Sequence, residues 1–219
     1  MLSRLADVLV PAVGRLTVTT AADAELVPGS VIAANHTSLA DPAVVLAALH
    51  RLGARPLVMA AAGLWRIPVL GRVLAREGHI PVHRGGRRAA HALDAAAEAL
   101  ERGEMVLIYA EGGLPHRTNA AEAAPGTFRS GLARLIERTG APLVPVGQAG
   151  ARRITSGSTA KQLAGLITAP LRRPELHVHV GRPLALPDGA AGTGQARAAV
   201  TDAWRMAAAR LAEPAALAA

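Results

Sequence analysis

One segment of the chain carries residues that could do acid–base chemistry: NHTSLAD at 35–41, with His36 five positions before Asp41. An imidazole can remove a proton from an alcohol, and a nearby carboxylate can fix its tautomer and stabilise the imidazolium. The apolar run 31–34 precedes the segment, and Pro42 with the apolar stretch 43–49 follows it. We therefore expect a buried strand, a turn that folds Asp41 back onto His36, and a helix in which Asp41 is the N-cap.

The spacing is weak taken alone, because a partly buried histidine beside a capping aspartate gives the same pattern. Other chemistries have less support. The chain has no cysteine, which excludes disulfides, thiolate metal sites and a cysteine nucleophile, and fits a reducing compartment. His177 and His179 would share one face of a strand, but no third ligand accompanies them, so we predict no metal site.

Composition limits the function classes. The chain has 219 residues, enough for one domain, and 51% are apolar. Its net charge is +8, with Lys161 the only lysine among 24 basic residues. Such an excess of arginine favours anionic partners such as a phosphorylated substrate or an anionic membrane surface, although a solvated basic surface is the plainer alternative. The four scattered aromatic residues do not favour nucleic acid.

Apolar runs alternate with amphipathic segments along the chain, which predicts a single α/β domain at 1–219 with a mostly parallel, mixed central sheet flanked by helices. Expected strands cover residues 31–34, 56–60, 80–83, 105–109, 143–146 and 176–180. Expected helices cover 42–52, 64–76, 89–102, 129–138 and about 195–211. We expect a polar connector at 17–30. Residues 147–175 are the least legible part, with an apolar segment at 163–167 flanked by basic residues. Two interpretations of it stay open: contact with lipid head groups, and the commoner one of a variable surface excursion.

The N-terminal segment 1–16 has leucines and valines at helical spacing and predicts an amphipathic helix. It has neither a long apolar core nor a clear cleavage site, so it does not indicate a signal peptide. No apolar run approaches the ~20 residues that span a bilayer. Two interpretations stay open: a helix lying in a membrane interface, and a helix packed on the domain.

Several short blocks occur in the order found in the glycerolipid acyltransferase family, which the chain resembles over about residues 30–185. This family includes the 1-acylglycerol-3-phosphate acyltransferases. The blocks are NHTSLAD at 35–41, GHIPVHR at 78–84, EGG at 111–113 and LVPV at 143–146, with FRSG at 128–131 and a late strand ending in GRP at 181–183.

The resemblance implies a fold and an activity. The implied enzyme is an O-acyltransferase of phospholipid biosynthesis that moves a fatty acyl group from acyl-CoA or acyl carrier protein to a hydroxyl of a lysophospholipid or glycerol phosphate, 1-acylglycerol-3-phosphate being the expected acceptor. It needs no cofactor. His36 would be the catalytic base and Asp41 its partner. With no covalent acyl carrier required, we expect direct transfer through one tetrahedral intermediate.

The same resemblance assigns the acceptor site. Arg84 would bind the acceptor phosphate, and Glu111 with Gly112 and Gly113 would organise the acceptor site. The family's third block usually reads Pro-Glu-Gly-Thr-Arg-Ser, whereas this chain has AEGGLP at 110–115. Its phosphate-binding arginine is therefore absent, and Arg129 is the expected substitute, with a further candidate at position 117.

This departure leaves two alternatives open. One is an acyltransferase of the same fold that acts on a non-phospholipid alcohol, and the other is a non-catalytic, basic lipid-binding protein. For the leading hypothesis we expect a cytoplasmic protein, peripheral on the inner face of the membrane. Its partners would be the acyl thioester, the acceptor and an anionic membrane surface.

Overall fold

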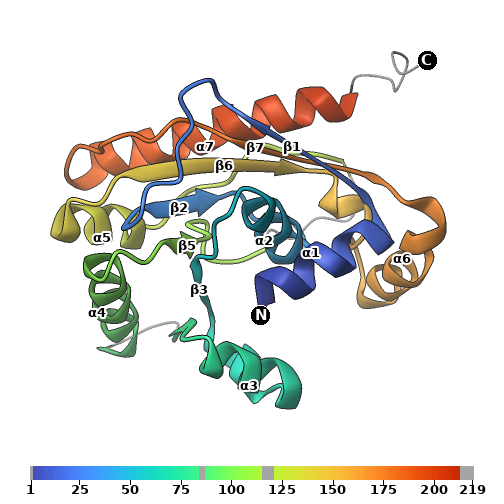
Figure 1. Cartoon of the computed structure of the whole chain (residues 1–219), viewed down its shortest axis with the longest axis horizontal. Coiled ribbons are helices and arrows are strands. Elements are labelled where there is room, and N and C mark those ends of the chain that lie inside the picture. Colours follow the sequence, from blue (N-terminus) through green and yellow to red (C-terminus); the bar gives the residue numbers. More distant parts are fainter. Residues whose placement is uncertain (1, 84–86, 115–120, 213–219) are drawn as a thin grey trace.

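The computed structural model of the chain describes residues 2–83, 87–114 and 121–212, with backbone alone at 87–89 (Figure 1). Its centre is a sheet of seven strands in the order β1-β7-β6-β2-β5-β3-β4. The strands are β1 (Arg15–Thr20), β2 (Val31–Ala34), β3 (Leu57–Ala61), β4 (Ile80–Val82), β5 (Val106–Ile108), β6 (Leu143–Ala149) and β7 (Glu175–Val180). Every neighbouring pair is parallel except β6–β7, which is antiparallel.

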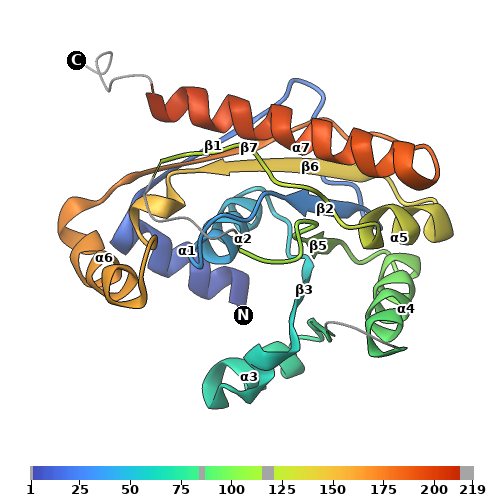
Figure 2. The same cartoon turned by 180° about the vertical axis from the view of Figure 1, so that it is seen from behind.

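Helices cover both faces of this sheet, which confirms the predicted single α/β domain with a mostly parallel, mixed sheet. The helices are α1 (Leu2–Val13), α2 (Asp41–Arg51), α3 (Pro68–Arg76), α4 (Arg87–Glu101), α5 (Gly131–Thr139), α6 (Thr159–Arg172) and α7 (Gly189–Ala212), with short 3-10 turns at Ala62–Arg66 and Ala151–Arg153. Figure 2 shows α7 lying along β6 and β7, on the opposite side of the sheet from α1, α2 and α6.

Successive side chains of the buried strands belong alternately to two apolar clusters, one on each face of the sheet. In β2, Ile32 and Ala34 belong to the apolar cluster under α1 and α2. Val31 and Ala33 belong to the second cluster, under α4, α5 and α7. Successive side chains of a strand point to opposite faces, so a strand covered on both sides must be apolar throughout. All four residues of β2 are fully buried, which fixes its position at the centre of the sheet.

Three sequence predictions about secondary structure are wrong. The connector predicted at 17–30 begins as strand β1, because an edge strand paired only with β7 keeps half its residues exposed and polar. The helix predicted at 64–76 is split, since Pro68 forces Ile67 into an extended conformation and a new helix begins at Pro68. The segment predicted as an excursion at 147–175 contains α6 and the end of β6.

Residues 35–41 lie where the strand order of the sheet reverses. Strands β3, β4 and β5 follow β2 in the chain and lie on one side of it, with β5 adjacent to β2, whereas β6 and β7 lie on the other side. In open α/β sheets, ligands bind beyond the carboxyl ends of the strands at such a switch point. His36 follows β2 there, and Glu111 follows the neighbouring β5. Among the described helices, none is long and apolar enough to cross a membrane.

Candidate active site

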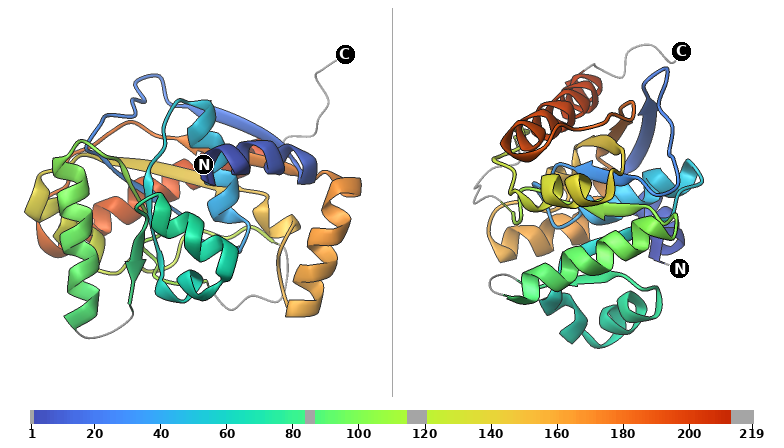
Figure 3. Two further views of the ribbon diagram at one scale, coloured as in Figure 1. Left: turned by 60° about the horizontal axis from the view of Figure 1, so that its bottom comes forward. Right: turned by 90° about the vertical axis from the view of Figure 1, so that its left-hand side faces the viewer.

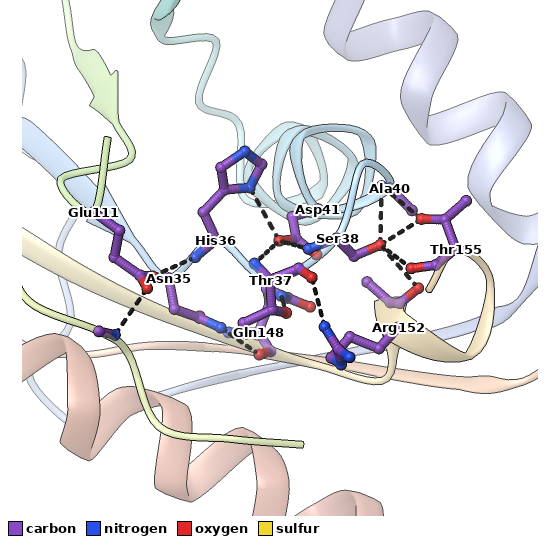
Figure 4. Close-up of polar contacts among 12 residues, drawn as sticks. Asn35, His36, Thr37, Ser38, Ala40, Asp41, Glu111, Gln148, Arg152 and Thr155 are labelled. Atoms are coloured by element: carbon purple, nitrogen blue, oxygen red, sulfur yellow. Dashed lines mark hydrogen bonds and ion pairs between the residues drawn. The ribbon is translucent and has the colours of Figure 1, made fainter. Parts of the chain in front are cut away.

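His36 and Asp41 are in direct contact at the end of β2 (Figure 4). The Nδ1 atom of His36 lies 3.1 Å from Oδ2 of Asp41, and the other ring nitrogen points away from the loop. An ionised carboxylate can only accept hydrogen bonds, so Nδ1 carries the proton and Nε2 is left as the base. The imidazole is 16% exposed, whereas the carboxylate is fully buried. The pair therefore has a general base open on one side and a sheltered anion behind it.

Asp41 does not cap helix α2 as predicted. The N-cap is Ala40, and Asp41 is the first helical residue, so its side chain is free to turn back over the loop. Its Oδ2 accepts hydrogen bonds from the backbone N–H groups of Thr37 and Ser38 as well as from His36. Burial raises the pKa of Asp41 above 3.8, while the imidazole and the two N–H donors act in the opposite direction.

Three sets of long-range contacts hold the loop from 35 to 41. The Asn35 side chain bonds both backbone groups of Gln148 in β6, at 2.8 and 3.0 Å. In the second set, the buried Arg152 donates from Nη1 to the Thr37 carbonyl at 2.8 Å. These contacts join residues more than 110 positions apart, so they fix the loop relative to the opposite half of the sheet.

Ser38 supplies the remaining contact. Its hydroxyl oxygen lies 2.5 Å from Oγ1 of Thr155, and its single O–H is within hydrogen-bond distance of the carbonyls of Ala151 and Thr155. This hydroxyl is therefore engaged inside the protein and turned away from His36, which makes it unsuited to be a nucleophile activated by that imidazole. Sequence reasoning missed Asn35, Ser38, Arg152 and Thr155 as site residues, since only the folded chain brings them together.

The ring of Tyr109 packs against the ring of His36. Its ring centroid lies 4.5 Å from that of His36, with the planes tilted by 35°. The phenol oxygen is buried and has no hydrogen-bond partner among the described residues. Burial, with a smaller contribution from the Asp41 charge, raises the pKa of Tyr109 well above 10.0, so the phenol stays protonated. Tyr109 could have been predicted as a site residue, because it stands two positions before Glu111 at the end of a buried strand.

Glu111 is bound by backbone on both oxygens. Oε1 accepts from the His36 N–H and Oε2 from the Gly126 N–H, each at 2.8 Å. The carboxylate thus links the end of β5 to His36 and to the loop that leads to α5. The structure gives Glu111 this organising contact; a direct contact with the acceptor stays a prediction.

Arg129 and the glycines meet at the same edge. Gly112 has a φ of +72°, a left-handed conformation that favours glycine, and the Arg129 side chain crosses over the place where a Cβ would stand. Gly113, the next residue, is partly exposed. Arg129 is exposed. An exposed cation therefore lies beside the backbone of Glu111–Gly113, where the sequence predicted an acceptor site.

Two of the predicted phosphate ligands, Arg84 and the alternative at 117, lie outside the described residues. The histidine pair on β7 does not form a metal site with other residues: within the described ranges, no group of three or more His, Asp or Glu residues could hold a metal ion. His179 instead lies 2.9 Å from the Thr19 hydroxyl, a contact between β7 and β1.

The fold and this pair define an α/β protein with a carboxylate-oriented histidine at the switch point of its sheet. The family model described as "Acyltransferase" matches residues 15–148, and the chain therefore belongs to the acyltransferase family. The resemblance found in the sequence blocks is thereby confirmed.

Two known proteins are similar to the chain. The chloroplastic 1-acyl-sn-glycerol-3-phosphate acyltransferase BAT2 of Brassica napus is 27% identical over 125 residues, which are 57% of this chain and 34% of that relative. The matched region thus spans about a third of the relative's length. The crystal structure of the 1-acyl-sn-glycerophosphate acyltransferase PlsC from Thermotoga maritima superposes with a TM-score of 0.72 at 17% identity, covering 98% of this chain and 80% of that one. At this identity the structural match supports the fold.

Proposed function

We propose that the protein is an O-acyltransferase that moves a fatty acyl group from an acyl thioester to a hydroxyl of a lysophospholipid or glycerol phosphate. The observation that carries the proposal is the His36–Asp41 contact, with the second ring nitrogen facing away from the protein loop (Figure 4). An alcohol near neutral pH is a poor nucleophile, and a positioned imidazole supplies the missing base. Both similar proteins named above carry acyltransferase names, which supports the reaction class.

The reaction would proceed by direct transfer. Nε2 of His36 takes the hydroxyl proton as the acceptor oxygen attacks the thioester carbonyl carbon. The tetrahedral intermediate then collapses with cleavage of the C–S bond, and the imidazolium returns its proton to the departing thiolate. Asp41 stabilises the imidazolium between these steps from a site shielded from water. The products are an ester and a free thiol.

The acceptor assignment rests on charge at the open side of His36. Arg129 is an exposed guanidinium over Gly112, and the forked geometry of arginine suits a phosphate. The relative from Brassica napus is named for 1-acyl-sn-glycerol 3-phosphate, which makes that compound the first acceptor to test. The altered block at 110–115 favours a second candidate, an alcohol without a phosphate, because the usual arginine is missing from it.

The proposed donor is acyl-CoA or acyl carrier protein, and the proposed location is cytoplasmic and peripheral on the inner face of a membrane. A net charge of +8 supports contact with an anionic surface. No cofactor is needed for the steps above, since the proton passes between substrate and His36 and the electron pairs move between and within the two substrates.

The test is release of free thiol from a long-chain acyl-CoA, measured with a panel of acceptors. We expect release to depend on 1-acylglycerol 3-phosphate and to be much slower with monoacylglycerol, which lacks the phosphate. Faster turnover with monoacylglycerol would replace the phospholipid assignment with the second candidate. No thiol release from acyl-CoA or acyl carrier protein with any acceptor would contradict the enzyme proposal and favour a lipid-binding protein.

A further inference from the structure

Helix α6 is poorly packed for a helix of 14 residues. Only Ala169 is buried, and four large apolar side chains are exposed, from 49% to 89%: Leu163, Leu166, Ile167 and Leu171. Their spacing of three, four and eight residues from the first places them on one side of the helix. Isolated helices of this length are marginal in water and gain their stability from packing of an apolar face. The stripe is therefore a surface suited to a partner.

A second apolar surface lies beside it. Ser3, Ala6 and Val10 of α1 face inward, and the outer side of that helix exposes Leu5, Val8 and Leu9. The two helices are neighbours on the same side of the sheet, as Figure 1 and the left view of Figure 3 show. Arg173, just after α6, donates to the carbonyl of Pro11 in α1 at 3.2 Å. The exposed apolar residues of α1 and α6 thus belong to one region, which we call the α1–α6 surface.

The charge of this region indicates what would cover it. Between 151 and 173 the chain has five basic residues and no acidic one. Arg152 is buried, and the other four are exposed. Lys161 is exposed in the first turn of α6, and Arg172 lies at its end. Arg172 bonds the carbonyls of Gly165 and Arg153, which holds its guanidinium along the helix. An apolar stripe with cations at both ends matches a bilayer surface with anionic head groups better than it matches a neutral protein.

We propose that the α1–α6 surface docks on an anionic phospholipid bilayer, with the stripe of α6 as its main contact. The inference deepens the function proposed above, in which the substrates are lipids. The segment that enters α6 is also the one that holds the catalytic loop, because Thr155 bonds Ser38 four residues before the helix begins. Docking through α6 therefore brings the bilayer to the end of β2, where His36 would receive a lipid acceptor.

The test is co-sedimentation of the full chain with vesicles. Wild-type protein should bind vesicles of phosphatidylglycerol and phosphatidylcholine more tightly than vesicles of phosphatidylcholine alone, and the difference should shrink as salt rises. Ile167→Glu should weaken vesicle binding about 10-fold, because burying one large apolar side chain contributes roughly a factor of 10 to the affinity. The double variant Leu163→Glu with Ile167→Glu should weaken it about 100-fold.

The matched control is Met206→Glu. Met206 is similarly exposed, at 54%, but lies on α7 across the sheet, so this variant should bind vesicles as the wild type does. His36→Ala should also bind normally, and binding needs no turnover, so failure of docking and failure of the enzymatic proposal are distinguishable. Circular dichroism melts should show all variants folded.

Three results would overturn the proposal. One is equal vesicle binding by wild type and the double glutamate variant. Another is loss of binding in Met206→Glu to the same degree. The third is a dimer by light scattering that the α6 substitutions dissociate, without vesicle binding by any form, since a second copy of the chain would then cover the stripe.

Discussion

The two sides of His36 are built differently. On the loop side, the side chains of Asn35, Thr37 and Ser38 are buried and bonded to residues in 148–155. The buried carboxylate of Asp41 is bonded within the loop itself. On the other side, beyond β5, Gly112 and Gly113 are partly exposed and Arg129 is exposed. The fold thus fixes the His36–Asp41 pair, and the proposed acceptor side consists of exposed residues and loops. Gly113 and Leu114, two of the residues that depart from the family pattern, lie on this second side.

The largest effect should come from His36→Ala. Loss of the general base is expected to lower kcat by ~100- to 10,000-fold, with little change in thermal stability because the imidazole is at the protein surface on one side. Thiol release and a thermal melt measure the two quantities. His50→Ala is the matched control, since that histidine lies at the other end of α2. A folded His36→Ala enzyme with near-normal turnover would refute the proposed mechanism.

Asp41→Asn should lower kcat by about 10- to 1,000-fold, less than loss of the base itself, because the amide no longer holds the tautomer or stabilises the imidazolium. Its effect on stability should depend on pH. The folded-state pKa of Asp41 is raised, so the wild type loses stability as pH increases above 3.8, where the unfolded carboxyl ionises. The variant lacks this loss.

Urea unfolding at several pH values measures the prediction for Asp41. The free energy of unfolding of Asp41→Asn minus that of the wild type should grow as pH rises above 3.8 and then level off once the folded wild type is ionised. A difference that shrinks with rising pH would show that the buried carboxylate is stabilised when charged, contrary to the burial effect described above.

Substitutions of the predicted phosphate-binding arginines should act on the acceptor KM and not on the chemistry. Arg84→Ala is expected to raise the acceptor KM about 10- to 100-fold, with Arg84→Lys recovering part of it, because charged hydrogen bonds contribute ~1.5–3 kcal/mol. Arg129→Ala should raise it less, up to about 10-fold. Arg134→Ala, an exposed arginine of α5, is the control. If neither Arg84→Ala nor Arg129→Ala alters the acceptor KM, the acceptor carries no phosphate at this site.

The smallest effect on kcat should come from Arg152, whose hydrogen bond to the Thr37 carbonyl holds the loop from 35 to 41. Arg152→Met removes the donor to the Thr37 carbonyl and leaves a buried acceptor without it, which should cost about 1–3 kcal/mol of stability. We expect a several-fold fall in kcat with the acceptor KM unchanged, because this residue positions the loop. Arg153→Met is exposed and should alter neither quantity. A rise in KM with normal kcat would place Arg152 on the substrate side instead.

The parts that sequence could predict are those with a local signature. The apolar run 31–34, the histidine–aspartate spacing and Pro42 together indicated a strand, a turn and a helix, and β2 and α2 lie there. Strand β1 was missed because an edge strand keeps polar residues on its exposed face. Helix α6 was missed because Gly165 and Pro170 lie inside it, and both residue types disfavour a helix interior.

Within the site, the sequence predicted the contact between His36 and Asp41, but not the hydrogen bonds that fix the loop around them. The bonds of Asn35 to Gln148 and of Arg152 to Thr37 join residues 113 and 115 positions apart. No local pattern encodes such contacts, since they depend on β6 lying beside β2 in the sheet. The error about the Asp41 cap has a related cause: the side chain that could cap the helix is used to bind the loop and the imidazole instead.

A double-mutant cycle tests most directly whether Asp41 acts on the reaction through His36. Acceptor-dependent thiol release is measured for wild type, His36→Ala, Asp41→Asn and the double variant, each shown to be folded. If the two residues form one unit, adding Asp41→Asn to His36→Ala should change the rate by no more than about 2-fold, because the imidazolium that Asp41 stabilises is already absent. A further loss as large as that of Asp41→Asn in the wild-type background would show that the aspartate acts independently and would contradict the proposed pair.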